Sequence, residues 1–243
     1  MIGYYTRDFR AGNVEAAVDY LALICLNAFI PGAIGKSQAS LCHEALRELV
    51  LETREFARLL GDIRSDGVRL KGAIEERLEI IGLADQEDFL KTVTIQAASV
   101  ADDNGRTTDA VLLYHLAEDY DNVIIIINRA LSEAIAVDIG AEPVRLQPLK
   151  PRSVVQDQNQ EVQGSSLSLT SVDDPVMLAK NMMTLYNNSA MYVQKIRQVN
   201  RETCGVLLRM SDAKAAMVVR DWARAFDVSC LFALHFYEDR TVS

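Results

Sequence analysis

Apolar residues recur with the spacing of an α-helix along almost the whole chain, and no other feature limits the possible folds as much. In the first clear example, Val14, Val18 and Leu21 lie three or four positions apart, as on one face of a helix. Only 5 prolines and 12 glycines occur among 243 residues, so few positions force a helix to break. Since 49% of the residues are hydrophobic, a sizeable core can form. The sequence therefore predicts an all-α fold.

Short polar or turn-forming segments divide this pattern into separate helices. Asn13 is a predicted N-cap, and Pro31 with Gly32 ends the first helix. Helices are expected over residues 14–28, 37–60, 70–81, 85–100, 108–116, 123–134, 175–199, 201–210 and 213–226. The β-branched run from Val123 to Ile127 is also compatible with a buried strand, but helical spacing continues to Ala134 and favours a helix. Residues 228–243 are less regular.

The breaks between the predicted helices are mostly short, as at Asp102–Gly105, Glu118–Asp121 and Ser211–Asp212. Short connections favour antiparallel neighbours, and stacked antiparallel helix pairs form a solenoid. We therefore expect residues 1–243 to form a single α-helical solenoid segment. A compact helical bundle remains the alternative, because no sequence repeat of fixed period is visible. Residues 147–171, which carry Pro148 and Pro151, many Gln and Ser residues and few apolar ones, are expected to form a loop or a flexible insertion.

The charge of the chain limits its possible partners, and its cysteines indicate the kind of compartment. The formal net charge is −9 and no two basic residues are adjacent, so direct nucleic-acid binding is not expected. The apolar stretch from Leu21 to Ile30 is too short to span a bilayer, so no membrane insertion is expected. The four cysteines are far apart and form no CxxC pair. Cys25, Cys42 and Cys204 are expected to be buried thiols in a reducing compartment, and Cys230 lies in the less regular end.

Two short motifs resemble ligand-binding loops, but each lacks an essential part. Gly35-Lys36-Ser37 is similar to the end of a phosphate-binding loop, which also needs a glycine at the position of Ile30 and a preceding strand. We interpret it as a helix start capped by Ser37. Asp102-Asp103-Asn104-Gly105 is similar to part of a calcium loop, but Val100 stands at the first ligand position, so an Asx turn is expected instead.

The remaining candidate groups also receive a structural interpretation. His43, His115 and His235 belong to no HExxH motif and to no Cys–His cluster, and His115 is expected to form a surface pair with Glu118. Ser99, Ser132 and Ser189 are predicted inside helices, and Glu75 and Glu76 on a solvated face. We therefore expect no enzyme activity, no catalytic residue, no cofactor and no metal. The sequence leaves the partner-binding residues undefined, and a nucleotide-dependent enzyme would rest on Gly35-Lys36-Ser37 alone.

Four segments stand out by their order along the chain. The longest is Asp102–Glu118, which Tyr120, Asn128 and Leu131 continue. The others are Tyr4–Phe9, Ala17–Leu21 and Ala45–Val50. Together they resemble the nucleoporin-interacting-component family, scaffold proteins of the nuclear pore inner ring. The similarity is greatest to fungal members and runs from the start of the chain to about Phe226.

The resemblance implies an α-helical solenoid, of the kind shared with some vesicle-coat proteins, and a structural role in the nuclear pore complex at the nuclear envelope. It implies that the chain binds other inner-ring nucleoporins and supports nucleocytoplasmic transport. The expected partner is a linear segment of a linker nucleoporin that docks in a groove between helices. The family's N-terminal coiled-coil region has no counterpart here, so the chain is expected to be the C-terminal solenoid portion of a longer protein. Val228–Ser243 does not match the family. A generic helical-repeat adaptor or a vesicle-coat-like scaffold is the alternative.

Overall fold

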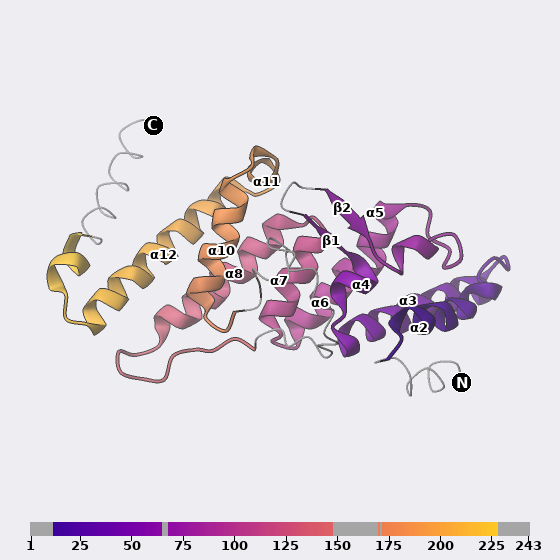
Figure 1. The fold of residues 1–243 in the computed structure, drawn as a ribbon, viewed down its shortest axis with the longest axis horizontal. Coiled ribbons are helices and arrows are strands. Elements are labelled where there is room, and N and C mark those ends of the chain that lie inside the picture. Colours follow the sequence, from indigo (N-terminus) through magenta and orange to yellow (C-terminus); the bar gives the residue numbers. More distant parts are fainter. Residues whose placement is uncertain (1–11, 65–67, 148–169, 171, 228–243) are drawn as a thin grey trace, which may run out of the picture. The chain divides into compact units, whose positions relative to one another are not determined.

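The computed structural model describes residues 12–64, 68–147, 170 and 172–227 and is built mainly of helices (Figure 1). The chain divides into two compact units, unit 1 (Met1–Asp119 and Pro148–Ser171) and unit 2 (Tyr120–Gln147 and Val172–Ser243). The elements of unit 1 are α2 (Val14–Ala22), η1 (Leu23–Asn27), α3 (Ala33–Thr53), α4 (Phe56–Leu60), β1 (Gly61–Ile63), β2 (Arg69–Lys71), η2 (Glu75–Arg77), α5 (Gln86–Phe89), η3 (Leu90–Thr94), α6 (Ile95–Asp103) and α7 (Thr107–Leu116). Those of unit 2 are α8 (Tyr120–Ala136), α10 (Pro175–Asn187), α11 (Ala190–Gln194) and α12 (Gln198–Val218).

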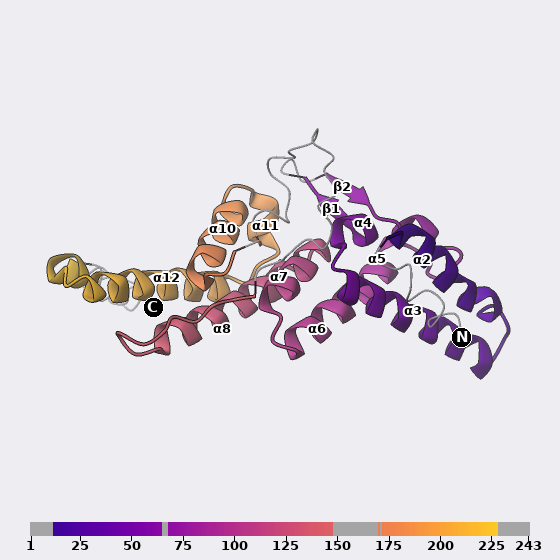
Figure 2. The same ribbon diagram turned by 60° about the horizontal axis from the view of Figure 1, so that its bottom comes forward.

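The helices of unit 1 form a series in which each packs on the next. α2 and η1 lie along α3, α3 contacts α6, and α6 pairs with α7 across a short connection (Figure 2). Leu21 of α2, Leu46 of α3 and Val111 of α7 are fully buried in this stack. Each such side chain contributes about 1.5–3 kcal/mol by leaving water. The predicted all-α class of stacked helix pairs is confirmed, and a single solenoid segment over residues 1–243 stays a prediction.

The first predicted helix is confirmed as α2 up to Ala22, where the 3-10 helix η1 follows, whereas the helix predicted over residues 37–60 begins earlier and is broken after Thr53. Asn13 Oδ1 accepts a hydrogen bond from the N–H of Ala16 (3.0 Å), as an N-cap does. α3 begins at Ala33 instead of Ser37. It ends at Arg54, whose φ of 58° lies in the left-handed region and cannot continue the helix. α4 therefore forms a separate short helix.

A β-hairpin lies between the helices predicted over residues 37–60 and 70–81 and replaces the start of the second one. β1 and β2 are antiparallel, with Asp62 opposite Leu70. Gly61 has a φ of 93°, and a Cβ there would lie 2.0 Å from the carbonyl oxygen of Leu70. A Cβ on Gly72 would lie 2.3 Å from the backbone nitrogen of Gly61. The helical prediction is wrong because this close approach, which only glycine allows, holds the chain extended before the short 3-10 turn η2.

The helix predicted over residues 85–100 is confirmed, with one irregular stretch inside it. Asp85 Oδ1 accepts a hydrogen bond from the N–H of Asp88 (2.9 Å) and so caps α5. Between α5 and α6 the five residues of η3 form a π-helix, whose wider turn shifts the backbone hydrogen bonds by one residue. The guanidinium of Arg47 on α3 donates to the carbonyl oxygen of Thr92 in this turn (3.0 Å). η3 is thereby tied to α3.

In unit 2, α8 packs along α12 and also contacts α10. The run from Val123 to Ile127 lies within α8, so it is helical and not a strand. The start of α10 is confirmed as predicted. Asp174 Oδ1 accepts a hydrogen bond from the N–H of Val176 (3.1 Å), and Pro175 occupies the first turn, where its missing N–H costs nothing.

Three helix boundaries in unit 2 differ from those predicted, one of them being the end of α12 at Val218, where the left-handed Arg220 (φ 59°) interrupts the helix predicted over residues 213–226. The helix predicted over residues 175–199 is divided into α10 and α11, and the next helix, α12, begins at Gln198. The break predicted at Ser211–Asp212 is wrong, because α12 continues through it. Asp212 is 39% exposed and pairs with Lys180 of α10 (3.0 Å), while the next residue, Ala213, is buried. A partly exposed polar pair does not interrupt a helix whose neighbouring face is packed.

Some of the predictions fall on residues outside those that the structure describes. Of the loop or insertion predicted over residues 147–171, Gln147 and the buried Thr170 are described. The end over residues 228–243, with Cys230 and His235, and the segment Tyr4–Phe9 lie outside the described residues. In the described part of the chain, no helix is long and apolar enough to cross a membrane.

Candidate partner-binding surface

The Gly35-Lys36-Ser37 motif lies in the first turns of α3. Gly32, with a φ of 103°, occupies the N-cap position, so the predicted cap at Ser37 is wrong. A Cβ on Gly35 would lie 2.1 Å from the carbonyl oxygen of Ile30. Glycine is therefore required at position 35 because the preceding connection crosses α3 closely. The motif has a packing role, and its place inside a helix is not that of a phosphate-binding loop.

The Asp102–Gly105 segment forms the C-terminal cap of α6. Gly105 has a φ of 69°, and the N–H of Arg106 donates to the carbonyl oxygen of Ala101 (2.9 Å), as in a Schellman motif. Asn104 Nδ2 donates to the carbonyl oxygen of Val100 (2.7 Å). The predicted helix break is confirmed, although a glycine cap makes it and not an Asx turn.

His43 and His115 are both buried, so the predicted surface position of His115 is wrong. The Nε2 atom of His43 lies 2.8 Å from the carbonyl oxygen of Ile81. Burial lowers the pKa of His115 to about 4, and the charge of Glu118 offsets this only in part. His115 is therefore neutral at pH 7. Among the described residues, no group of three His, Cys, Asp or Glu side chains is arranged to hold a metal ion.

The predicted buried thiols are confirmed at Cys25, Cys42 and Cys204, which are free and fully buried. Cys25 Sγ donates to the carbonyl oxygen of Ile81, and Cys42 Sγ to that of Leu21, each at 3.4 Å. Burial raises the pKa of all three thiols, and that of Cys204 to about 12. Because the thiolate is the reactive form, these groups are inert at neutral pH.

The serine and glutamate candidates have structural positions. Ser99 lies in α6, and Ser132 in α8 donates to the carbonyl oxygen of Asn128 (2.8 Å). Ser189 lies between α10 and α11, so its predicted place inside a helix is wrong. The predicted solvated face is wrong for Glu75, which is 3% exposed. The carboxylate of Glu75 forms an ion pair with Arg69 of β2.

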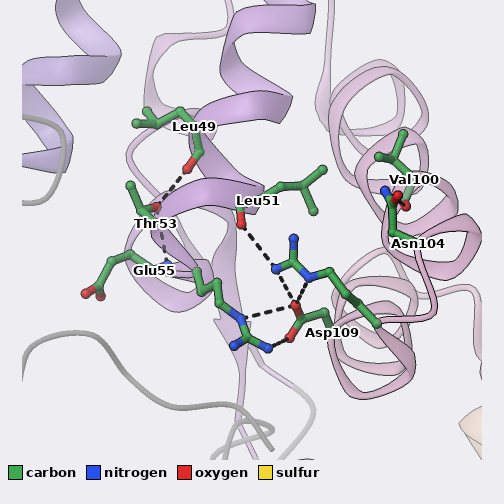
Figure 3. A network of polar contacts seen from close by, with 9 residues as sticks. Leu49, Leu51, Thr53, Glu55, Val100, Asn104 and Asp109 are labelled. Carbon is green, nitrogen blue, oxygen red and sulfur yellow. Dashed lines mark hydrogen bonds and ion pairs between the residues drawn. The ribbon is translucent and has the colours of Figure 1, made fainter. Parts of the chain in front are cut away.

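Two arginines enclose the buried carboxylate of Asp109 at the start of α7 (Figure 3). Arg54, which ends α3, donates through Nε (3.1 Å) and Nη2 (2.5 Å) to the two carboxylate oxygens. Arg106, just after α6, donates through Nε to Asp109 Oδ2 (2.6 Å) and through Nη2 to the carbonyl oxygen of Leu51 (3.1 Å). The Asp109 side chain is 0% exposed. Since a buried carboxylate needs such partners, this cluster fixes α3, α6 and α7 against one another.

A third arginine, Arg69, anchors the β-hairpin to the helices of unit 1. Its Nε donates to Glu75 Oε2 (3.2 Å). Its Nη1 donates to the carbonyl oxygen of Leu116 (2.6 Å) and its Nη2 to that of Leu60 (3.1 Å). These two carbonyl groups lie at the C-terminal ends of α7 and α4, where no further turn of helix uses them. The hairpin is therefore a fixed part of unit 1.

In unit 2, Asp121 joins the start of α8 to the start of α12. It accepts hydrogen bonds from the N–H of Arg197 (3.0 Å), from Arg197 Nε (2.6 Å) and from Asn200 Nδ2 (2.8 Å). Partial burial alone would raise the pKa of Asp121, but the hydrogen bonds from Asn200 and Arg197 outweigh it and lower the pKa. The carboxylate thus stabilises the N-terminal end of α12, as expected for a negative charge there.

The two ends of α8 are held by different contacts. At its C-terminal end, Lys214 Nζ donates to the carbonyl oxygens of Ala134 (3.0 Å) and Ile135 (3.1 Å) and also contacts that of Val137. At its N-terminal end, the rings of Tyr120, Tyr186 and Tyr192 pack against one another in tilted and edge-to-face arrangements, with centroids 4.9–5.3 Å apart. These contacts join α8 to α10, α11 and α12 within unit 2.

A group of large apolar side chains is exposed around the connection between η1 and α3. We call it the apolar tip, and its members with their exposed fractions are Leu23 (44%), Leu26 (65%), Phe29 (71%), Ile30 (48%) and Ile34 (66%). Lys36 is the only Lys, Arg, Asp or Glu residue between Asp19 and Glu44. Contiguous exposed apolar side chains with few charges are typical of interaction surfaces. The apolar tip is the candidate partner-binding surface of unit 1.

Sequence reasoning missed the apolar tip because helical spacing identifies an apolar face but not whether anything covers it. Leu41, at helical spacing from the buried Leu49 of α3, is 49% exposed, whereas the adjacent Cys42 is fully buried. Val199, three positions after the buried Ile196, is 62% exposed. The lack of charge from residue 20 to residue 43, apart from Lys36, was the available signal.

Comparison with known proteins gives consistent results. The family model Nup93/Nic96 matches residues 1–231. The chain is 60% identical to nucleoporin NIC96 of Chaetomium thermophilum over 93% of the chain and 21% of that protein. It is 39% identical to nucleoporin NIC96 of Saccharomyces cerevisiae over 91% of the chain and 23% of that protein. It is 28% identical to nuclear pore complex protein Nup93 of Xenopus tropicalis over 75% of the chain and 20% of that protein.

A solved structure agrees with the sequence comparisons. The crystal structure of Chaetomium thermophilum Nic96 SOL matches 95% of this chain and 32% of its own, with a TM-score of 0.80 at 58% identity. The chain thus spans about a fifth of the length of the curated relatives that it matches. The family match extends through both units, and the helical fold is that of a solved family member. The resemblance found in the sequence is therefore confirmed, and the chain belongs to the Nup93/Nic96 family.

Proposed function

We propose that this chain is part of a structural scaffold of the nuclear pore complex inner ring, at the nuclear envelope. In this role it binds other nucleoporins and supports nucleocytoplasmic transport without catalysis. The observation that carries the proposal is the 60% identity with nucleoporin NIC96 over 93% of the chain. The enclosed carboxylate of Asp109 and the anchored hairpin agree with it, because a scaffold has to keep its helices in fixed positions.

The partner that we propose is a linear segment of a linker nucleoporin of the inner ring. The segment would place apolar side chains against the apolar tip, in the way that an amphipathic helix binds an apolar surface. Phe29 and Ile34 have the largest exposed fractions of the tip, 71% and 66%, so they are the proposed anchors. The lack of charge around them favours a segment whose contacting face is also uncharged.

Size-exclusion chromatography with light scattering tests this function. The chain is run alone and then mixed with linker-nucleoporin segments, and a stable co-eluting complex is expected. The double variant Phe29→Asp/Ile34→Asp should lose the complex, because two carboxylates would then face apolar groups of the partner. Ile139→Asp is the matched control, since Ile139 is 59% exposed but belongs to unit 2. A folded chain that binds no segment would contradict the proposed partner.

A further inference from the structure

The outer edge of the β-hairpin presents backbone groups directed away from the rest of the sheet. In the described part of the chain the sheet has two strands, β1 and β2. The N–H of Arg64 donates to the carbonyl oxygen of Val68 (3.0 Å), and Asp62 opposite Leu70 is the next pair of the same kind. Since hydrogen-bonded and non-hydrogen-bonded pairs alternate in antiparallel strands, the N–H and C=O groups of Arg69 and Lys71 point away from β1.

This edge is held in place before any partner arrives. The guanidinium of Arg69 is fixed by Glu75, by the carbonyl oxygen of Leu116 and by that of Leu60, as described above. On its inner side, β1 contacts α4 and α7, so β2 is the outer strand of the pair (Figure 1). A strand added to a fixed edge loses less conformational freedom than one added to a mobile loop.

The side chains along β2 define the chemistry of a segment that would fit there. Val68, which directly precedes β2, and Leu70 within it are two positions apart and hence on one face, and they are 51% and 42% exposed. Lys71 lies on the opposite face and is exposed. An added strand would therefore place apolar side chains beside Val68 and Leu70 and acidic side chains beside Lys71.

We propose that the outer edge of β2 binds an extended peptide segment of a partner protein, which adds to the hairpin as a third strand. The segment alternates apolar and acidic residues. Its backbone pairs with Arg69 and Lys71, so that main-chain hydrogen bonds supply affinity and the alternating side chains supply specificity. The three-residue length of β2 and the presence of Lys71 limit pairing to short, acidic segments and disfavour pairing of the hairpin with itself. This inference goes beyond the proposed function, because it does not depend on the apolar tip or on the identity of the partner.

A pair of methylated peptides tests the proposal on the unmodified chain. The probe is a capped seven-residue peptide in which valine and glutamate alternate, labelled for fluorescence anisotropy. One derivative carries N-methyl groups on all the valines and the other on all the glutamates. Because only alternate peptide N–H groups face the edge, one derivative should bind like the parent and the other about tenfold more weakly. Equal binding of both derivatives, or no binding of the parent, would overturn the proposal.

Variants of the chain locate the contact. Lys71→Pro removes an outward N–H without touching a β1–β2 hydrogen bond and should weaken binding of the parent peptide about tenfold. Leu70→Glu should weaken it by repulsion of the acidic peptide, whereas Ile139→Glu, in unit 2, should leave it unchanged. Amide hydrogen exchange read by NMR should slow at Arg69 and Lys71 in the complex. Slowing confined to other residues would show a different binding site and would overturn the proposal.

Discussion

Unit 1 and unit 2 are both helical, but they hold their charged groups in different ways. In unit 1, the side chains of Asp109 and Glu75 are 0% and 1% exposed and are bound by arginines. In unit 2, the side chain of Asp121 is 20% exposed and its partner Arg197 is 67% exposed, and the ion pair of Lys180 with Asp212 is exposed on both sides. Breaking a buried ion pair leaves an uncompensated charge, whereas an exposed pair contributes little. Equivalent substitutions should therefore have unequal effects in the two units.

The largest effect is expected at Asp109. Asp109→Ala leaves the guanidinium groups of Arg54 and Arg106 facing a small apolar side chain in a largely buried place. We expect the free energy of unfolding to fall by about 3–5 kcal/mol, as measured by urea denaturation. A loss below about 1 kcal/mol would mean that the enclosed carboxylate does not hold the stack of unit 1 together.

A smaller effect, dependent on pH, is expected at His115. Burial lowers its pKa to about 4 in the folded chain, from an ordinary value of 6.5. The unfolded chain therefore takes up the proton first as the pH falls. The stability that neutral His115 contributes is complete above pH 6.5 and is lost between pH 6.5 and 4, at up to about 1.4 kcal/mol per pH unit.

Comparison of the chain with its His115→Gln variant isolates this contribution. Between pH 7 and pH 5, the original chain should lose about 2 kcal/mol more of its free energy of unfolding than the variant does. Urea denaturation at the two pH values measures the difference. Identical losses in both proteins would contradict the burial of a neutral imidazole at position 115.

At the C-terminal end of α8, Lys214→Met should cost about 1–2 kcal/mol of unfolding free energy. Methionine keeps most of the apolar stem but cannot donate to the carbonyl oxygens of Ala134 and Ile135. Lys180→Met, at an exposed ion pair of the same unit, is the matched control for loss of a positive charge. Thermal denaturation of both variants would measure the difference, and equal effects would argue against a capping role for Lys214.

The smallest effect is expected for Asp212→Ala in α12. Its pair with Lys180 is exposed on both sides, at 46% and 39%, and such pairs contribute about 0–1 kcal/mol. Alanine also favours helix more than aspartate does, which offsets part of the loss. The free energy of unfolding lost in Asp212→Ala should be nearly the same when denaturation is measured at low and at high salt. A loss as large as that of Asp109→Ala would remove the distinction between the two units.

The parts of the fold that depend on local sequence were predictable. Helical spacing identified α2 and the start of α10, and Asn13 marked the N-cap of α2, because neighbours along the chain decide these features. The β-hairpin was not predictable in this way, since it depends on the close approach of Gly61 and Gly72, which periodicity does not reveal. The enclosure of Asp109 was also hidden, because its partner Arg54 lies 55 positions away in the sequence.

The candidate partner-binding surface was less predictable than the fold. Phe29 and Ile34 have the same apolar character as the buried Leu46, and the sequence alone gives no account of which faces have neighbours. The near absence of charge between Asp19 and Glu44 was visible, but it is equally typical of a covered helix. The packing of α2, η1 and α3 decides that Phe29 and Ile34 are exposed, and this packing is visible only in the structure.

The most direct test of the proposed scaffold role replaces the matching segment of nucleoporin NIC96 of Saccharomyces cerevisiae with residues 1–231 of this chain. The fluorescently tagged chimera is compared with a protein that lacks the segment altogether. The scaffold role predicts that the chimera is found at the nuclear rim and is isolated together with other nucleoporins, whereas the deleted protein is not. A chimera that is folded and yet behaves like the deleted protein would contradict it.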